Sequence, residues 1–204
     1  GAEGCNVQQV YDFKANRSVA GFDIPHLLNA NATYDLPFGA GKQFASGSKF
    51  WDGVIGHWSL NGIFTIRSGE PYSVGVNGDI PNVGGSNNVR ANIVGSAAPA
   101  NRTWQTYLNT AAFTVPDPFT FGDTGRNAFR YGKLSNIDMS LMRDFPLPLG
   151  EATRLQFRME AFNTINHAVL GGCLDATVQD ANFGIANCTR NTEREVQFAL
   201  KLYF

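Results

Sequence analysis

The strictest constraint in this sequence is an alternation of apolar residues with other residues, in stretches of about nine positions. The chain ends on one such stretch, REVQFALKLYF, whose apolar side is formed by Val196, Phe198, Leu200, Leu202 and Phe204. Successive side chains of a β-strand point to opposite faces of its sheet, so a period of two predicts a strand with one apolar face. Chain termini usually fray, so a terminal strand this regular must be paired and must have an apolar environment to face.

The same alternation recurs at four earlier places in the chain. Together these stretches predict five strands, near residues 27–36, 54–67, 135–145, 153–163 and 194–204. The segment NVQQVYDFKANRS is a candidate for a sixth strand. The connections at 77–133 and 164–193 are long, and both fall on one side if Phe204 ends on the other. The predicted fold class is all-β, an antiparallel up-and-down meander with its long loops on one side.

Alternation alone does not decide what the apolar face contacts. In a soluble sandwich that face points into the core, whereas in an outer-membrane barrel it points to lipid and the polar face lines the lumen. Three of the alternating stretches run for nine residues (28–36, 58–66 and 196–204), about the length of a tilted membrane-spanning strand. Soluble strands more often have about five or six residues. We therefore expect residues 1–204 to form one segment of an outer-membrane-type β-barrel.

The barrel interpretation assigns each face of the sheet an environment. An outer, apolar face is expected to contain Leu60, Phe64, Phe157, Met159, Phe198 and Leu202. The lumen-facing polar residues are expected to include Asn29, Asn31, Asn61, Arg158, Glu160 and Lys201. Dry burial of such charges would cost several kcal/mol each unless they were paired, whereas lining a wet lumen costs little. Arg143 interrupts the apolar face near the end of its strand, where a long side chain can reach a lipid headgroup.

Charge and motif content exclude several functions. The chain has 16 Lys and Arg against 17 Asp and Glu, which leaves no basic footprint for nucleic acid. PFGAGK departs from the phosphate-binding loop pattern, which needs Gly at Leu36 and Ser or Thr at Gln43. We find no nucleophile–base pair and no cluster of metal ligands at usable spacing. The sequence therefore predicts no enzymatic activity and no cofactor.

Three cysteines are present, and none forms a C-x-x-C pair. Cys173 and Cys188 share one polar loop and can close it as a disulfide, with two free thiols as the alternative. The Asn-rich surroundings favour the oxidised, extracytoplasmic interpretation. Cys5 is left over, and we expect it to bond to a further segment or to a second copy of the chain.

Five stretches together resemble a known family. They are FDIPHLLNANATYDLPFGAGK, HWSLNGIFTIRSGEPYSV, FGDTGRNAFRYGKLSNIDMSLMRDF, LQFRMEAFNTINH and QFALKLYF. Their order and wording resemble the C-terminal barrel region of TonB-dependent outer-membrane receptors, in particular the Oar-like group with an N-terminal carboxypeptidase-regulatory-like domain. The resemblance implies a non-catalytic barrel that imports a bulky substrate with energy passed through TonB. It also implies that the plug domain and the TonB-contacting segment would precede this sequence, and that the alternating residues up to Phe204 act as a barrel-assembly signal.

Two other functions stay open at this point. Five strands are too few for a closed single-chain barrel, which starts at about eight. Gly1 is not an initiator methionine, and the cysteine count is odd. The chain could therefore be a processed fragment that builds an extracellular filament, tube or oligomeric barrel by strand pairing between copies. A soluble β-sandwich binding module is the third hypothesis. The expected partners are outer-membrane lipid or further copies of the chain, with the remaining strands and plug, and with TonB only through those parts.

Overall fold

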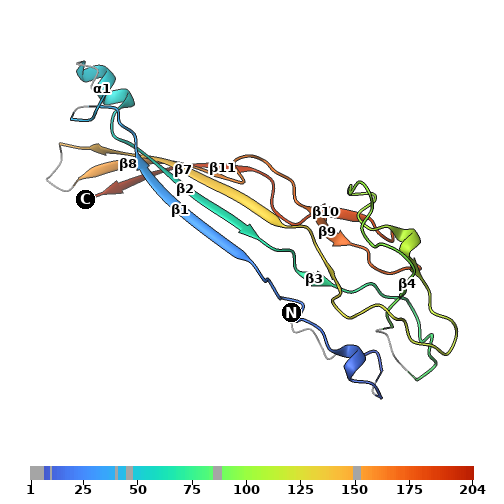
Figure 1. Ribbon diagram of the computed structural model, residues 1–204. Helices are drawn as coiled ribbons and strands as arrows, with labels where there is room; N and C mark the ends of the chain where they lie inside the picture. The colour runs from blue at the N-terminus through green and yellow to red at the C-terminus, as the bar shows by residue number, and fades with distance from the viewer. Residues whose placement is uncertain (1–6, 10, 40, 45–47, 85–88, 149–152) are drawn as a thin grey trace. The chain divides into compact units, whose positions relative to one another are not determined.

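The computed structural model describes residues 7–9, 11–39, 41–44, 48–84, 89–148 and 153–204 (Figure 1). The chain divides into two compact units. The strand unit comprises Leu28–Ile66, Ser135–His167 and Thr192–Phe204. The loop unit comprises Gly1–Leu27, Arg67–Leu134 and Ala168–Asn191.

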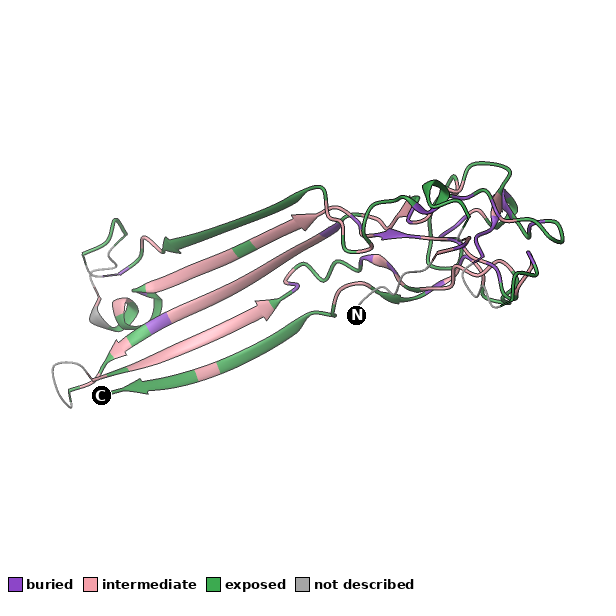
Figure 2. Ribbon diagram, turned by 90° about the horizontal axis from the view of Figure 1, so that it is seen from below, coloured by how far each residue is buried: buried purple, intermediate pink, exposed green. Residues whose placement is uncertain are grey.

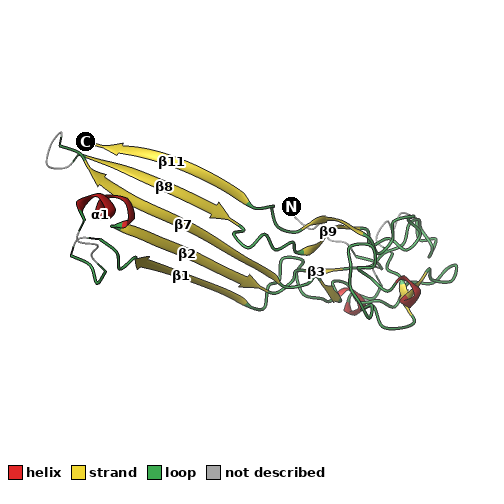
Figure 3. Cartoon of the chain, turned by 90° about the horizontal axis from the view of Figure 1, so that it is seen from above, coloured by secondary structure: helices red, strands yellow, loops and turns green. Residues whose placement is uncertain are grey.

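The strand unit is built on a five-stranded sheet with the order β1-β2-β7-β8-β11, in which neighbouring strands run in opposite directions (Figure 3). The spatial order of these long strands follows their order in the chain. The predicted all-β class and antiparallel meander are therefore confirmed. The strands are β1 (Leu27–Asp35), β2 (Trp58–Arg67), β7 (Leu134–Pro146), β8 (Arg154–Phe162) and β11 (Glu195–Tyr203).

The pairing of β7, β8 and β11 separates apolar from polar side chains. Leu200 of β11 lies opposite Phe157 of β8, and Leu141 of β7 lies opposite Met159 of β8. Residues directly opposite each other share a face, so one face of these strands carries Met139, Leu141, Phe145, Leu155, Phe157, Met159, Val196, Phe198, Leu200 and Leu202. The other face carries Ser140, Asp144, Gln156, Arg158, Glu160, Gln197 and Lys201.

Side-chain contacts extend the same division over β1 and β2. The Trp58 ring packs edge-on against Phe157, with centroids 5.8 Å apart, so Trp58 belongs to the apolar face. On the other face, Asn61 Nδ2 donates to Thr33 Oγ1 at 3.1 Å. Alternation then puts Leu60 and Phe64 on the apolar face, and Asn29 and Asn31 on the polar face. The sheet thus has an apolar face, interrupted by Arg143 near the end of β7, and a mainly polar face.

A turn at Asn163 fixes the end of β8. Asn163 has a φ of 47°, a left-handed conformation that asparagine adopts more readily than most residues. Its Oδ1 accepts from the His167 N–H at 3.0 Å, and its Nδ2 donates to the Thr192 carbonyl at 2.9 Å. Its own N–H donates to Asp138 Oδ1 at 2.9 Å. The Asn163 side chain thereby joins the segments that lead out of β8 and into β11, and its backbone N–H adds the link to β7.

The start of the second predicted strand is wrong. Val54 and Ile55 were expected in the strand near 54–67, but they belong to helix α1 (Lys49–Ile55), and β2 begins only at Trp58. His57 between them has a φ of 62° and turns the chain from helix into strand. A helix of two turns presents too few apolar residues for a period of 3.6 to be recognised.

The loop unit has a hydrophobic core of its own. Short strands pair in it as β3 (Pro71–Tyr72) with β6 (Phe129–Arg130), β4 (Asn92–Ile93) with β5 (Phe113–Thr114), and β9 (Leu170–Leu174) with β10 (Ala186–Thr189). Two 3₁₀ turns accompany them, η1 (Lys14–Asn16) and η2 (Thr110–Ala112). Buried segments gather in this unit, whereas the strands of the large sheet are half-buried or exposed, except at Leu134 and Arg143 of β7 (Figure 2). The core contains Tyr72, Val74, Val76, Val89, Ala91, Leu108, Ala112 and Phe113.

Two further expectations need correction. The ranges 77–133 and 164–193 were predicted as long loops, but they hold β4, β5, β6, β9 and β10 and part of this core. The described residues of the candidate sixth strand (7–9 and 11–18) contain η1 and no strand. Its buried Asn16 accepts from the Gln8 N–H at 2.9 Å, which folds the segment back on itself. No helix among the described residues is long and apolar enough to span a membrane.

Candidate functional site

The polar face of the sheet carries a connected group of charged and amide side chains. Arg158 Nη2 lies 2.5 Å from Glu160 Oε1, and Gln197 Nε2 donates to the other oxygen of the same carboxylate. These residues meet because β8 and β11 place Gln197 opposite Glu160. Lys201 lies opposite Gln156, whose Nε2 donates to Asp144 Oδ1 at 2.9 Å. Three strands therefore contribute one hydrogen-bonded polar surface, in which most charges have a partner of opposite sign.

The polar face continues over the first two strands with shorter side chains. Ser59 donates to Asp35, whose carboxylate lies 3.6 Å from Lys42 Nζ. The hydrogen bond from Asn61 to Thr33 lies on this face, and so do the predicted polar residues Asn29 and Asn31. This half of the face is thus lined mainly by hydroxyl, amide and carboxylate groups.

The C-terminal stretch leaves its apolar side chains exposed. The exposed fractions are 48% for Val196, 66% for Phe198, 66% for Leu200 and 54% for Leu202. Phe204 follows the last residue of β11 and is 98% exposed. A row of large apolar side chains with this much exposed surface is unfavourable in water, which indicates that the row contacts something other than water.

Both edges of the sheet are open within the described part of the chain. β1 and β11 are the outermost strands of the sheet, and each has a single hydrogen-bonded neighbour. Unpaired backbone groups cannot stay exposed to hydrocarbon, so a spanning sheet must continue into further strands.

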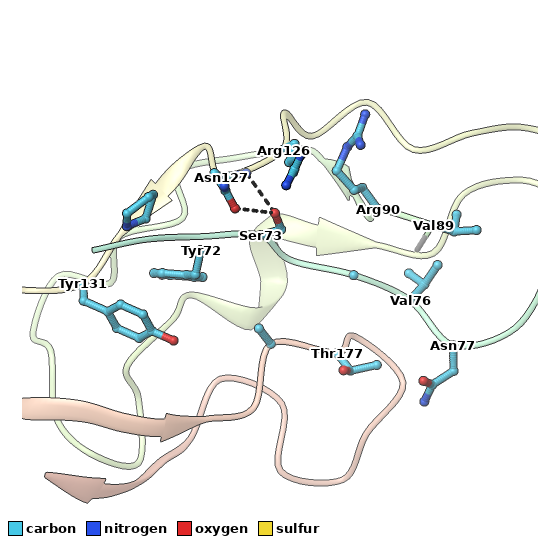
Figure 4. A pocket seen from close by; sticks show the side chains of 13 residues that line it. Tyr72, Ser73, Val76, Asn77, Val89, Arg90, Arg126, Asn127, Tyr131 and Thr177 are labelled. Carbon is cyan, nitrogen blue, oxygen red and sulfur yellow. Dashed lines mark hydrogen bonds between the residues drawn. The ribbon is translucent and has the colours of Figure 1, made fainter. Parts of the chain in front are cut away.

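A pocket of about 430 Å³ opens in the loop unit (Figure 4). One wall is the ring pair of Tyr72 and Tyr131, with centroids 4.5 Å apart. Next to Tyr72 in the chain, Ser73 Oγ accepts from the Asn127 N–H at 2.8 Å (Figure 4). The described residues that line the pocket are Pro71, Tyr72, Ser73, Gly75, Val76, Asn77, Val89, Arg90, Arg126, Asn127, Tyr131, Ala176 and Thr177.

The lining combines neutral phenols with positive charge. Burial raises the pKa of both Tyr72 and Tyr131, and the neighbouring Tyr107 raises the pKa of each further. Both hydroxyls therefore stay protonated at neutral pH and can donate as well as accept hydrogen bonds. The lining also contains two arginines and, among its described members, no carboxylate. The Arg90 guanidinium already donates to the Thr124 and Ala15 carbonyls and to Asn16 Oδ1, so this arginine is held by the fold of the loop unit.

Comparison with known proteins bears on the two-faced sheet. No curated protein and no solved structure matches the chain. A family described as "outer membrane beta barrel domain" matches residues 1–197. The chain belongs to this family. An outer-membrane barrel domain explains in one step the long antiparallel strands, the exposed apolar face and the polar face behind it. It also places the protein in the bacterial outer membrane.

The structure brings together most of the residues that the sequence singled out in this barrel domain. Arg158 and Glu160 are in contact, Asn29, Asn31, Asn61 and Lys201 share their face, and the C-terminal apolar row is continuous with Phe157 and Met159. Cys5 lies outside the described residues. Among the described residues, no group of three or more His, Cys, Asp or Glu side chains is placed to hold a metal ion.

Several site residues were not found from the sequence. Tyr72 and Tyr131 are 59 positions apart, and Arg90 lies in a third segment, so no local pattern links them. The pocket exists only because the loop unit folds these segments against one another. The one usable signal was the Tyr in each of the stretches GEPYSV and FRYGK, both of which contribute to the resemblance described above.

A disulfide joins Cys173 of β9 to Cys188 of β10, with the two Cα atoms 5.4 Å apart. This is the pairing expected from the shared polar loop, and the separation is normal for a disulfide.

Removing this disulfide is expected to weaken the loop unit selectively. The bond closes a loop with a sequence separation of 15, for which the chain-entropy model gives about 3 kcal/mol. The double variant Cys173→Ala/Cys188→Ala should therefore speed hydrogen exchange in β9 and β10, with little change in β8 and β11. Cys5→Ala is the control, because it leaves the bonded pair intact. Equal exchange in the double variant and the wild type would show that the disulfide contributes no stability.

Proposed function

We propose that this chain is the C-terminal barrel portion of a TonB-dependent outer-membrane receptor, with a transport role and no catalysis. The observation that carries the proposal is the continuous two-faced sheet with both edges open. Family membership supports the barrel, and the resemblance of five stretches to the Oar-like receptors supports the TonB-dependent class. A loop unit with its own core and pocket fits the part of a receptor that meets its substrate.

The two faces of the sheet then contact different environments, lipid on one side and a water-filled lumen on the other. The apolar side of β8 and β11, including Phe157 and Leu200, faces lipid. The polar face, with Arg158, Glu160 and Lys201, lines the lumen, where water and the Arg158–Glu160 ion pair satisfy the charges. The reverse orientation would put these charges in hydrocarbon, at about 2–4 kcal/mol for each basic side chain near the midplane.

The remaining strands and the plug complete the receptor. Five strands do not close a single-chain barrel, which needs about eight or more. β1 and β11 therefore pair with further strands of the same protein, and TonB acts on the plug and not on this segment.

The decisive experiment uses the native protein purified from outer membranes in detergent. We expect an intact mass well above 22.2 kDa. We also expect binding to the periplasmic C-terminal domain of TonB, and a faster-migrating folded band on unheated gels. An outer-membrane porin prepared in parallel is the control for TonB binding. A large barrel that does not bind TonB would contradict the receptor class and leave the barrel intact.

A second function is supported by the same open edges. β1 and β11 could pair between copies, so that the chain acts as a self-assembling structural subunit of a filament, tube or oligomeric barrel. In that case the native mass would be near 22.2 kDa, and the protein would be recovered as a large assembly. The mass measurement therefore separates the two functions.

A further inference from the structure

Helix α1 presents an exposed apolar face of its own. Its large apolar side chains are exposed by 70% at Phe50, 53% at Trp51, 46% at Val54 and 40% at Ile55. At 100° per residue, these positions fall within one 140° sector, and Asp52 and Gly53 lie outside it. A short helix that connects two strands on the surface of a soluble protein would turn these apolar side chains toward the protein interior. Here the apolar sector points away from the protein.

Two side chains from the apolar face of the sheet hold the end of this helix. The Val54 carbonyl accepts from Trp58 Nε1 at 3.0 Å and from Arg143 Nη1 at 2.6 Å. Trp58 packs against Phe157, and Arg143 lies opposite Phe157 in the β7–β8 ladder. The last carbonyls of a helix have no partner within the helix, and these two hydrogen bonds satisfy one of them. It also fixes α1 on the apolar side of the sheet, not on the polar side.

Arg143 occupies an unusual place for a charged residue. Only 6% of its surface is exposed, and its guanidinium lies 4.5 Å from the Phe145 ring centroid and 5.6 Å from that of Trp58. None of the ion pairs among the described residues involves it, and its Nε has no hydrogen-bond partner there. The guanidinium has aromatic neighbours and lies three residues from the end of its strand. Both features are typical of the level at which a membrane changes from hydrocarbon to headgroups.

We propose that α1 is an in-plane membrane anchor, which lies in the bilayer interface with Phe50, Trp51, Val54 and Ile55 in phospholipid, and that Arg143 pins it to the barrel wall. The proposal rests on the barrel with its apolar face in lipid. The occupant follows from continuity, because Trp58 and Arg143, two side chains of that apolar face, bond directly to the end of the helix. Amphipathic helices of this kind insert about 5–10 Å into the boundary between headgroups and acyl chains.

The depth of α1 can be measured by spin labelling of the full-length protein in phospholipid vesicles. One label is placed at Phe50→Cys and the control label at Gln43→Cys, an exposed position in the same connection, both in a Cys5→Ser background. We expect the label at 50 to collide several-fold more with oxygen than with a water-soluble nickel chelate, relative to the label at 43. Equal nickel access at both positions would place α1 in water and overturn the proposal. Low access to both reagents at 50 would also overturn it, because the helix would then be covered by protein, either a plug or a second copy.

The role of Arg143 has its own variant. Arg143→Met keeps the length and the apolar contacts with Trp58 and Phe145 but cannot donate to Val54. We expect a folded barrel in which the label at 50 becomes several-fold more mobile and loses its preference for oxygen. An unchanged label would show that Arg143 does not pin the helix. Heat-dependent gel migration of the same samples reports the barrel separately, so a failed anchor and a failed barrel give different results.

Discussion

Leu200→Arg is expected to prevent stable insertion of this protein into the outer membrane. Leu200 is near the middle of β11, opposite Phe157, and 66% of its surface is exposed on the apolar face. An arginine on the lipid side of a barrel strand near the bilayer midplane costs about 2–4 kcal/mol. β11 also carries the proposed barrel-assembly signal, so we expect the substitution to reduce both the assembly of the barrel and its stability. Membrane fractionation and heat-dependent gel migration should show loss of the folded, membrane-embedded form.

The matched control is the adjacent residue. Lys201 lies opposite Gln156 on the polar face, so Lys201→Gln removes a charge without placing a polar group in lipid. We expect it to fold and insert at the wild-type level. If Leu200→Arg instead gave a soluble, folded monomer, the apolar face would not contact lipid, and inter-chain assembly through it would be excluded as well.

Gly122→Ala is expected to unfold the loop unit and spare the strand unit. A Cβ at this position would lie 1.8 Å from the Arg90 carbonyl oxygen and 2.7 Å from that of Ala91. Both atoms belong to backbone, and Ala91 is fully buried in the core, so neither can move aside cheaply. Overpacking of a well-packed core costs about 1–3 kcal/mol and occasionally more, and we expect the upper end or beyond.

Hydrogen exchange measures this effect where it should occur. The Thr124 N–H donates to the Ala91 carbonyl at 3.1 Å, and the Ala91 N–H donates to the Val74 carbonyl at 3.1 Å. Both amides should lose protection in Gly122→Ala, while those of β8 and β11 keep it. Gly95→Ala is the control in the same unit, because its Cβ would meet Ala112 Cβ at 3.7 Å, an ordinary contact. Equal protection in the two variants would mean that the segment around Gly122 does not pack as described.

The sequence by itself determined the large sheet. Apolar residues at every second position fix which side chains share a face, because the period of a strand is two whatever the strand packs against. The strand ranges, the exposed row from Val196 to Phe204 and the polar row through Arg158 and Glu160 could all be predicted for this reason. The start of the second strand was predicted wrongly, because Val54 and Ile55 extend the apolar run but belong to a two-turn helix.

Only the tertiary structure decided the loop unit and the anchor. The core around Val74 and Val89 is assembled from strands of two residues and irregular turns, in which no period exists to be recognised. The Tyr72–Tyr131 pair and the approach of Gly122 to Arg90 join segments tens of residues apart, so they depend on packing that no local pattern encodes. Arg143 illustrates the difference. Its position near a strand end could be deduced from the sequence, but its bond to the Val54 carbonyl required the helix to fold back over the apolar face of the sheet.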